Sequence, residues 1–132
     1  MDYVEPVLVE GRIKIPYRWP AGAVGGRFLD VLRREERFIG LRCPSCRRVA
    51  VPPRPRCLAC RVPSEDWVAV GPEGCVTTWT RRPAGVLALI RLDGADTAIL
   101  HRLVEVDKPR SGMRVTPVFD DGLLGFKPRG ER

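Results

Sequence analysis

Residues 43–46 read Cys43-Pro44-Ser45-Cys46 and residues 57–60 read Cys57-Leu58-Ala59-Cys60, with ten residues between the two pairs. Two facing CxxC turns supply four thiolates, the soft ligand set that Zn²⁺ takes in tetrahedral structural sites. The gap suits a hairpin that joins the two turns. The spacing therefore predicts one closed structural Zn(Cys)₄ site. Two disulfides or a redox-active CxxC pair are the alternatives.

The charge of the chain is concentrated around these cysteines. The 132 residues carry 23 Lys and Arg against 16 Asp and Glu, a formal net charge of +7. Residues 27–62 hold ten arginines and three acids, so this stretch alone has a net charge of 10 − 3 = +7. Such a stretch suits nucleic acid, a phosphorylated ligand, an acidic partner or a solvated surface. The four thiolates of a zinc site would offset two of these positive charges.

Length and composition limit the class of protein. A chain of 132 residues, 44% apolar and 30% charged, suits one domain or two small ones with a real core. The longest apolar run, residues 86–90, is too short to span a bilayer. Asp2 and Glu5 stand where a secretory leader would be cationic, and no lipidation motif closes the chain. We therefore expect a cytoplasmic protein that is neither secreted nor membrane-bound.

The N-terminal part of the chain predicts one short strand and one helix. Residues 13–17, Ile13-Lys14-Ile15-Pro16-Tyr17, suggest an edge strand that proline ends. Phe28, Val31 and Leu32 then follow at i, i+3 and i+4, which is the narrow apolar stripe of an amphipathic helix. This stripe either packs on its own domain or docks a partner.

From Asp66 onward the pattern is that of β-structure. Apolar strand-like runs occur at 67–70, 75–80, 86–92, 98–100 and 113–119, separated by glycine turns such as Asp93-Gly94. Five short strands without a helix favour a small OB-like barrel at this size. We predict a mainly β fold: an N-terminal extension (1–26), a short helix (27–38), a rubredoxin-like zinc ribbon (39–64) and a five-stranded OB-like β-barrel (65–132).

The sequence contains no recognisable catalytic motif. Cys75 lies in a predicted strand and is expected to be a small core residue rather than a nucleophile. His101 is the one histidine of the chain and has no Ser or Cys motif beside it. We therefore expect that the chain alone is not an enzyme and assign no catalytic residue.

The order of helix, four-cysteine ribbon and barrel resembles the acyl-CoA-associated zinc-ribbon/OB-fold family, whose members accompany thiolase-family enzymes and were catalogued as a domain of unknown function. The similarity covers about residues 13–128 and is carried by Phe28–Leu32, Ile39–Cys46, Val51–Arg54, Gly74–Thr80, Leu89–Leu92 and Gly112–Val115. Arg47 and Arg61 depart from the family pattern because glycine is usual after each CxxC. The loop Arg81–Gly85 also looks shorter than in the family.

The resemblance implies a non-catalytic accessory subunit of a thiolase, ketoacyl-CoA synthase or retro-aldolase that acts on acyl-CoA thioesters. A thiolase-fold partner would supply the catalytic groups and form a hetero-oligomer with this chain through the helix and ribbon. The barrel would lie near the CoA entrance, with a CoA thioester at the interface and CoA-contacting residues unassigned. The candidate docking residues are Phe28, Val31, Leu32, Tyr17 and Trp19.

A single-stranded nucleic-acid-binding module is the alternative, because ribbons and OB barrels both serve that role. The barrel region, within residues 63–132, has ten bases and ten acids, and this neutrality disfavours nucleic acid. A standalone enzyme that uses Cys75 or His101 is a third and weaker alternative.

Overall fold

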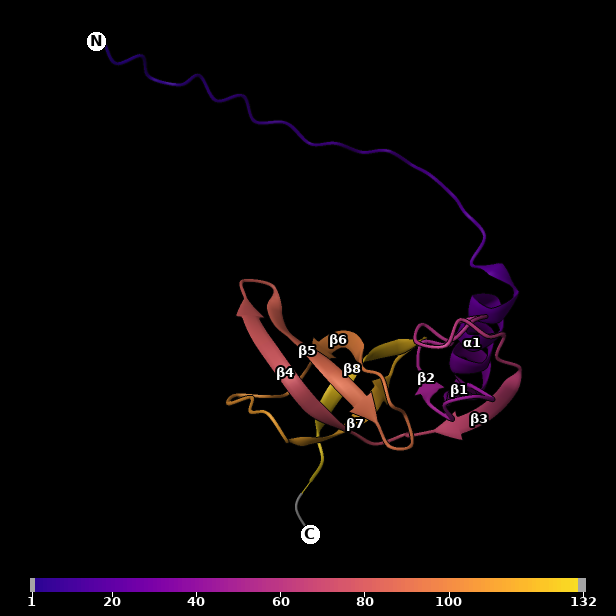
Figure 1. Ribbon diagram of the computed structural model, residues 1–132. Coiled ribbons are helices and arrows are strands. Elements are labelled where there is room, and N and C mark those ends of the chain that lie inside the picture. Colours follow the sequence, from indigo (N-terminus) through magenta and orange to yellow (C-terminus); the bar gives the residue numbers. More distant parts are fainter. Residues whose placement is uncertain (1, 131–132) are drawn as a thin grey trace.

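The computed structural model describes residues 2–130, and one helix and eight strands are formed within that range (Figure 1). The helix α1 (Gly22–Glu35) precedes a three-stranded antiparallel sheet of β1 (Phe38–Arg42), β2 (Val49–Ala50) and β3 (Asp66–Val70) in the order β2-β1-β3. The other five strands close a barrel: β4 (Gly74–Arg82), β5 (Gly85–Leu92), β6 (Ile99–Leu103), β7 (Arg114–Phe119) and β8 (Leu123–Pro128).

The barrel has the strand order β4-β5-β6-β8-β7, which is 1-2-3-5-4 when its own strands are counted. Its pairs are antiparallel except for β6 and β8, which run parallel, and β4 pairs with β7 to close the ring. This is the Greek-key order of an OB-like barrel. The predicted mainly β fold, with a short helix, a ribbon region and a five-stranded barrel, is confirmed.

Two strands differ from the sequence-based prediction. Residues 67–70 were expected in the barrel, but β3 pairs with β1 of the ribbon sheet, in the register Leu41↔Trp67. The fifth barrel strand is instead β8, which lies beyond the last strand-like run of the sequence. Gly125 interrupts the apolar pattern of β8 because a Cβ there would lie only 2.9 Å from the Arg102 side chain on β6. Close approach of two strands thus required a residue that weakens the strand pattern.

The helix begins at Gly22, five residues before its predicted start at residue 27. Asp30 and Arg34, four residues apart on α1, form an ion pair with 2.8 Å between Oδ1 and Nε. Phe28 is 7% exposed and belongs to the core, and Val31 and Leu32 pack against that core. The apolar stripe thus covers the helix's own domain, and Leu29 is the large apolar residue that α1 exposes. No helix among residues 2–130 is long and apolar enough to cross a membrane.

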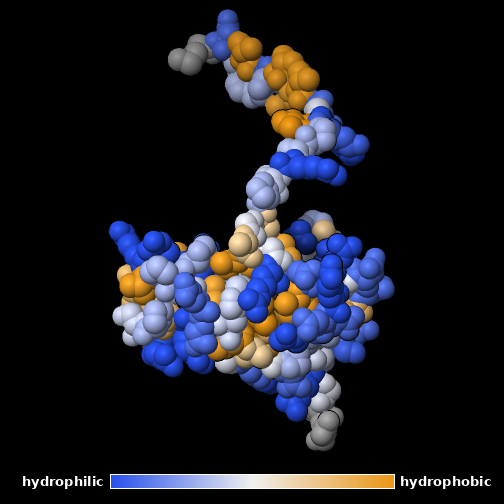
Figure 2. Space-filling view, turned by 90° about the vertical axis from the view of Figure 1, so that its right-hand side faces the viewer, coloured by the Kyte–Doolittle hydropathy of each residue, from blue (hydrophilic) through white to orange (hydrophobic). Residues whose placement is uncertain are grey.

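Residues 2–21 form an extended N-terminal segment that runs away from the folded body (Figure 1). The residues from 2 to 21 are all exposed, and apolar side chains gather along the segment well outside the body (Figure 2). The edge strand predicted at 13–17 has no ladder partner among the described residues. We call residues 2–21 the N-terminal extension.

The ribbon sheet and the barrel share one continuous core. Phe38 of β1 is 1% exposed and stacks on Phe126 of β8, with 5.9 Å between the ring centroids. One cluster of buried residues includes side chains from α1, from the ribbon sheet and from all five barrel strands. Val76, Ile90 and Val115 are among its barrel residues. Aromatic pairs of this kind stabilise a junction beyond their area burial. The ribbon is therefore anchored on one end of the barrel.

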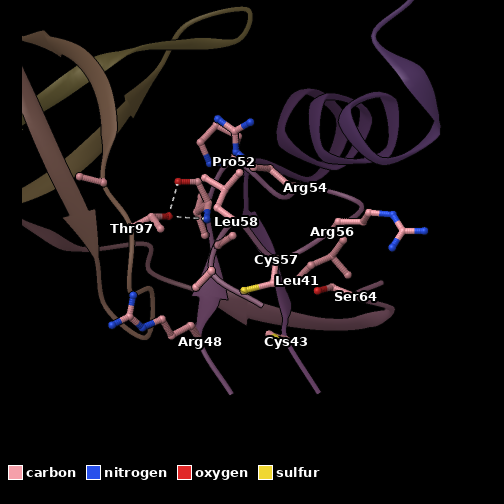
Figure 3. Close-up of a pocket in the computed structure, with 14 residues that line it drawn as sticks. Leu41, Cys43, Arg48, Pro52, Arg54, Arg56, Cys57, Leu58, Ser64 and Thr97 are labelled. Atoms are coloured by element: carbon pink, nitrogen blue, oxygen red, sulfur yellow. Dashed lines mark hydrogen bonds between the residues drawn. The ribbon is translucent and has the colours of Figure 1, made fainter. Parts of the chain in front are cut away.

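The loop between β5 and β6 also ties the barrel to the free edge of β2. Asp96 accepts a hydrogen bond from the Val49 amide through Oδ2 at 2.8 Å, and its own amide donates to the Val49 carbonyl at 2.9 Å. The Thr97 hydroxyl accepts from the Val51 amide at 2.7 Å and donates to the Val51 carbonyl at 2.8 Å (Figure 3). The bonds thus satisfy the N–H and C=O groups of the buried residues Val49 and Val51, which face away from β1 and have no strand as a partner on that side.

Replacing Thr97 by valine should therefore destabilise the protein. The substitution keeps the shape but leaves the buried Val51 amide and carbonyl without their partner, which costs about 1–3 kcal/mol. The free energy of unfolding, measured in urea with zinc present, should fall by this amount. Thr80→Val is the control, because Thr80 is exposed on the hairpin of β4 and β5. Equal stability of Thr97→Val and the parent would contradict the proposed tie.

Candidate metal centre

Two backbone turns of the same design hold the four cysteines. In the first turn the Cys43 amide donates to the Arg48 carbonyl at 2.8 Å, and the Arg47 amide donates to the Cys43 carbonyl at 3.0 Å. In the second, the Cys57 amide donates to the Val62 carbonyl at 3.1 Å, and the Arg61 amide donates to the Cys57 carbonyl at 2.8 Å. Each CxxC segment thus forms a closed turn with both sulfur atoms on one side.

The two turns bring the four sulfur atoms together. One ligand atom each from Cys43, Cys46, Cys57 and Cys60 lies within 4.8 Å of the others. The sulfur atoms of Cys46 and Cys57 are 3.7 Å apart. A tetrahedron with zinc–sulfur bonds of about 2.3 Å requires sulfur–sulfur distances of roughly 3.8 Å. The geometry fits one structural zinc ion, as the spacing predicted, and all four coordination positions come from the protein.

Backbone amides favour the thiolate form of the ligands. The Cys46 amide donates to the Cys43 sulfur at 3.5 Å and the Ser45 amide does so at 3.4 Å. The Cys46 amide is the main cause that lowers the pKa of Cys43 to about 7. The amides of Cys60 and Ala59 lower the pKa of Cys57 in the same way. The turns thus favour the thiolate form of Cys43 and Cys57. At Cys46, a backbone hydrogen bond at Arg48 is outweighed by burial and the neighbouring cysteine side chains, which raise the pKa to about 11.

Arg47 and Arg61 occupy the same position of the two turns, directly after each CxxC. Their φ angles are 65° and 60°, in the left-handed region. Glycine adopts this conformation without a steric penalty, whereas an L side chain pays about 1–2 kcal/mol. These two departures from the family pattern therefore carry backbone strain.

A cavity of about 260 Å³ lies beside the metal centre, between the ribbon and the loop that carries Thr97 (Figure 3). Its wall is mainly apolar and includes Leu41, Val51 and Leu58. Arg48, Arg54 and Arg56 also line it. Sequence reasoning missed this cavity because its two sides, within residues 41–64 and at 97–98, are more than 30 residues apart in the chain. Its chemistry suits an apolar group with an anionic end.

The two weaker candidates for chemistry do not meet. Cys75 pairs with Arg91 of β5 and His101 pairs with Ala88 of β5. Arg91 is exposed and Ala88 is buried, so the two positions lie on opposite faces of the barrel wall. Cys75 is half-buried rather than a core residue, and burial lowers the pKa of His101, whose Nδ1 has no hydrogen-bond partner. They form no nucleophile–base pair.

Residues 32–66 match the family model described as ChsH2, rubredoxin-like zinc ribbon domain. This part of the chain is thus similar to the zinc ribbon of that family. The resemblance predicted from the sequence is thereby confirmed, and the predicted zinc cofactor agrees with the match. Comparison with the curated proteins gives no match.

Two solved structures share the fold of ribbon and barrel. A chain of the structure described as the Ltp2-ChsH2(DUF35) aldolase is 24% identical, with a TM-score of 0.63, over 84% of this chain and 98% of that one. A DUF35-family protein of unknown function from Sulfolobus solfataricus is 23% identical, with a TM-score of 0.66, over 82% of this chain and 87% of that one. Both similarities concern the arrangement of the backbone.

Metal analysis should find one zinc ion per chain, and removing one ligand should abolish it. Cys57→Ser is expected to lower zinc content to near zero and to expose the second turn to protease, because that turn has little core of its own. Cys75→Ser is the matched control, since Cys75 lies on the barrel, and should retain the metal. Zinc content and limited proteolysis are the measurements. Full zinc in Cys57→Ser would contradict the assignment.

Replacement by glycine should cost less stability at the left-handed positions 47 and 61 than at a neighbouring position. Arg47→Gly relieves backbone strain in the folded state but increases the entropy of the unfolded chain. Because the two effects oppose each other, the free energy of unfolding should rise or change by less than about 1 kcal/mol. Arg48→Gly is the control, because the φ angle of Arg48 is not positive and glycine relieves no strain there. This variant should lower the free energy of unfolding by about 0.5–1 kcal/mol. Equal losses in both variants, measured in zinc-loaded protein, would contradict a strained turn.

Proposed function

We propose that this chain is a non-catalytic accessory subunit of a thiolase-family enzyme, whether thiolase, ketoacyl-CoA synthase or retro-aldolase, that acts on acyl-CoA thioesters. The observation that carries the proposal is a closed ChsH2-type metal centre in a chain that exposes a long apolar extension. The structure with the same fold described as an aldolase of Ltp2 and ChsH2(DUF35) supports a role within a complex. The catalytic groups then belong to the partner.

Among residues 2–130, Cys75 and His101 do not assemble into a reactive site, which supports the non-catalytic part of this proposal. A Zn(Cys)₄ centre leaves no open position for substrate or water. Cys75 and His101 lie on opposite faces of the barrel wall, as their pairing partners on β5 indicate. The chain therefore contributes binding and positioning rather than bond chemistry.

For the docking surface we propose Tyr17 and Trp19, which the sequence suggested together with Phe28, Val31 and Leu32, and we add one residue of α1. Phe28 is buried in the core, and Val31 and Leu32 are half-buried against it, so the apolar stripe of α1 leaves little for a partner. Tyr17 and Trp19 remain candidates because they are 67% and 72% exposed. Leu29, which is 52% exposed on α1, joins them. Large exposed apolar side chains of this kind mark contact surfaces.

The arginines of the ribbon suit the phosphates of a CoA thioester held at the interface. Arg48, Arg54 and Arg56 line the cavity beside the metal centre. Guanidinium groups bind phosphate through two parallel hydrogen bonds, which a single lysine cannot offer. We expect the substrate path at the end of the barrel that is nearest this cavity.

The nucleic-acid alternative has little support in the barrel. Stacking platforms need exposed aromatic rings, but Phe126 is fully buried and Phe119 packs against the core. Trp67 is covered by the Arg27 guanidinium, 4.6 Å from the ring centroid. Trp79, 38% exposed, is the barrel tryptophan that remains. One such ring falls short of a ladder for successive bases.

Affinity capture with the tagged full chain from its native cell tests the proposal. The chain should recover a subunit that mass spectrometry identifies as a thiolase-fold protein, and acyl-CoA turnover should require both proteins. Leu29→Arg should weaken this complex about tenfold or more, because it places a charge in an apolar contact. Leu100→Arg, at an exposed position of β6, is the control. Recovery of a lone monomer, or turnover by the chain alone, would refute the proposal.

A further inference from the structure

We propose that residues 12–19 of the N-terminal extension bind as an added β-strand at a free sheet edge of the partner subunit, an inference that rests on the proposed function. The partner edge must have an apolar surface on one side of its sheet and carboxylates on the other. The argument uses the side chains, the prolines and the conformation of this segment, which we call the docking strand.

Side chains of the docking strand alternate with period two. The odd positions hold the apolar residues and the even positions hold the basic ones and a proline; in order, the odd residues are Ile13, Ile15, Tyr17 and Trp19, and the even ones are Arg12, Lys14, Pro16 and Arg18. Successive side chains of a strand point to opposite faces. An extended docking strand therefore has one fully apolar face and one basic face.

The structure already holds the segment in this form. The apolar side chains at 13, 15, 17 and 19 are 67–86% exposed, and no described strand pairs with them. The rings of Tyr17 and Trp19 stack with 4.6 Å between centroids, so these two odd side chains lie on the same side. Ile15 and Trp19 each precede a proline, which restricts them to extended backbone. At these two residues less conformational freedom is lost when a partner binds.

The prolines decide which edge of the docking strand can pair. Along a strand, the N–H groups of odd residues point to one side and those of even residues to the other. Proline lacks an N–H group, and all three prolines of the extension, Pro6, Pro16 and Pro20, are at even positions. The odd edge keeps every donor, whereas the even edge is interrupted. The docking strand can therefore pair with a sheet through its odd edge, but its even edge cannot accept a further strand. Natural edge strands use proline in the same way.

The remaining part of the extension lacks this design. Between residues 3 and 9, apolar side chains stand at even positions as well as odd ones, as at Val4 and Leu8. No single apolar face results, so the register of such a strand would be weakly specified. Gly11 separates this part from the docking strand. The apolar pair Val7 and Val9, 89% exposed, therefore serves as an internal control.

The basic face identifies the chemistry of the partner. Arg12, Lys14 and Arg18 follow one side of the docking strand, and no ion pair engages them among the described residues. Carboxylates beside the receiving edge would therefore pair with them and fix the register. A second copy of the docking strand would instead face these three cations with its own. Charge thus favours an acidic partner over self-association.

Amide hydrogen exchange resolved to single residues, measured on the complex of the full chain with the captured thiolase-fold subunit, tests the proposal. The amides of Ile13, Ile15, Tyr17 and Trp19 should become protected at least tenfold relative to the free chain. The amides of Arg12, Lys14 and Arg18 should keep exchanging. Protection of odd and even amides alike would indicate a helix or a buried tail and would overturn strand addition.

Paired substitutions provide the second measurement. Ile13→Ser with Ile15→Ser should weaken the complex about tenfold or more, whereas Val7→Ser with Val9→Ser should change the dissociation constant less than threefold. Both pairs lie outside the folded body, so neither should unfold it. Equal weakening would indicate nonspecific adhesion and overturn the proposal, as would a dimer of the chain that depends on residues 12–19. A complex that forms without odd-edge protection refutes only the docking strand; absence of any complex refutes the proposed function with it.

Discussion

Four sulfur atoms within 4.8 Å of one another are the constraint on which the ribbon depends. Every residue from 54 to 63 is exposed or half-buried, so this stretch, which supplies Cys57 and Cys60, brings almost nothing to the hydrophobic core. A turn with so little apolar burial cannot offset its conformational entropy by packing. Metal–thiolate bonds replace the missing core, and the free energy of zinc binding becomes folding free energy for this part of the chain.

The other half of the ribbon is held by the barrel rather than by the metal. Phe38 stacks on Phe126 inside the barrel end, and Asp96 and Thr97 pair the outer edge of β2 through Val49 and Val51. Zinc therefore secures the second turn, and the barrel secures β1 and β2. A local opening of residues 54–63 needs to break no contact of the shared core, which makes this stretch the part of the ribbon that responds first to metal loss.

Local patterns in the sequence predicted the metal centre, the helix and the strands β3 to β7, because CxxC turns and strand periodicity are short-range. They failed where the outcome depends on distant residues. Strand periodicity does not name a strand's partner, so β3 was placed in the barrel although it pairs with β1. The apolar stripe around Phe28 could pack on its own domain or on a partner, and only the three-dimensional fold distinguishes these two arrangements. Thr97 resembles an ordinary loop residue until the edge that it caps, at Val51, is seen beside it.

The excess positive charge lies on particular parts of the surface, and some of the ribbon arginines are already paired within the chain. Within the ribbon, Arg42 pairs with Asp66 at 3.2 Å, and Arg56 donates to the Arg61 carbonyl at 2.9 Å. Four thiolates around zinc offset two charges, which leaves 7 − 2 = +5 over residues 27–62. The docking strand adds three cations on one face. The ribbon and the docking strand thus both present positive charge. A partner surface that contacts both must be acidic along its length, or hold anionic phosphates where the ribbon contacts it.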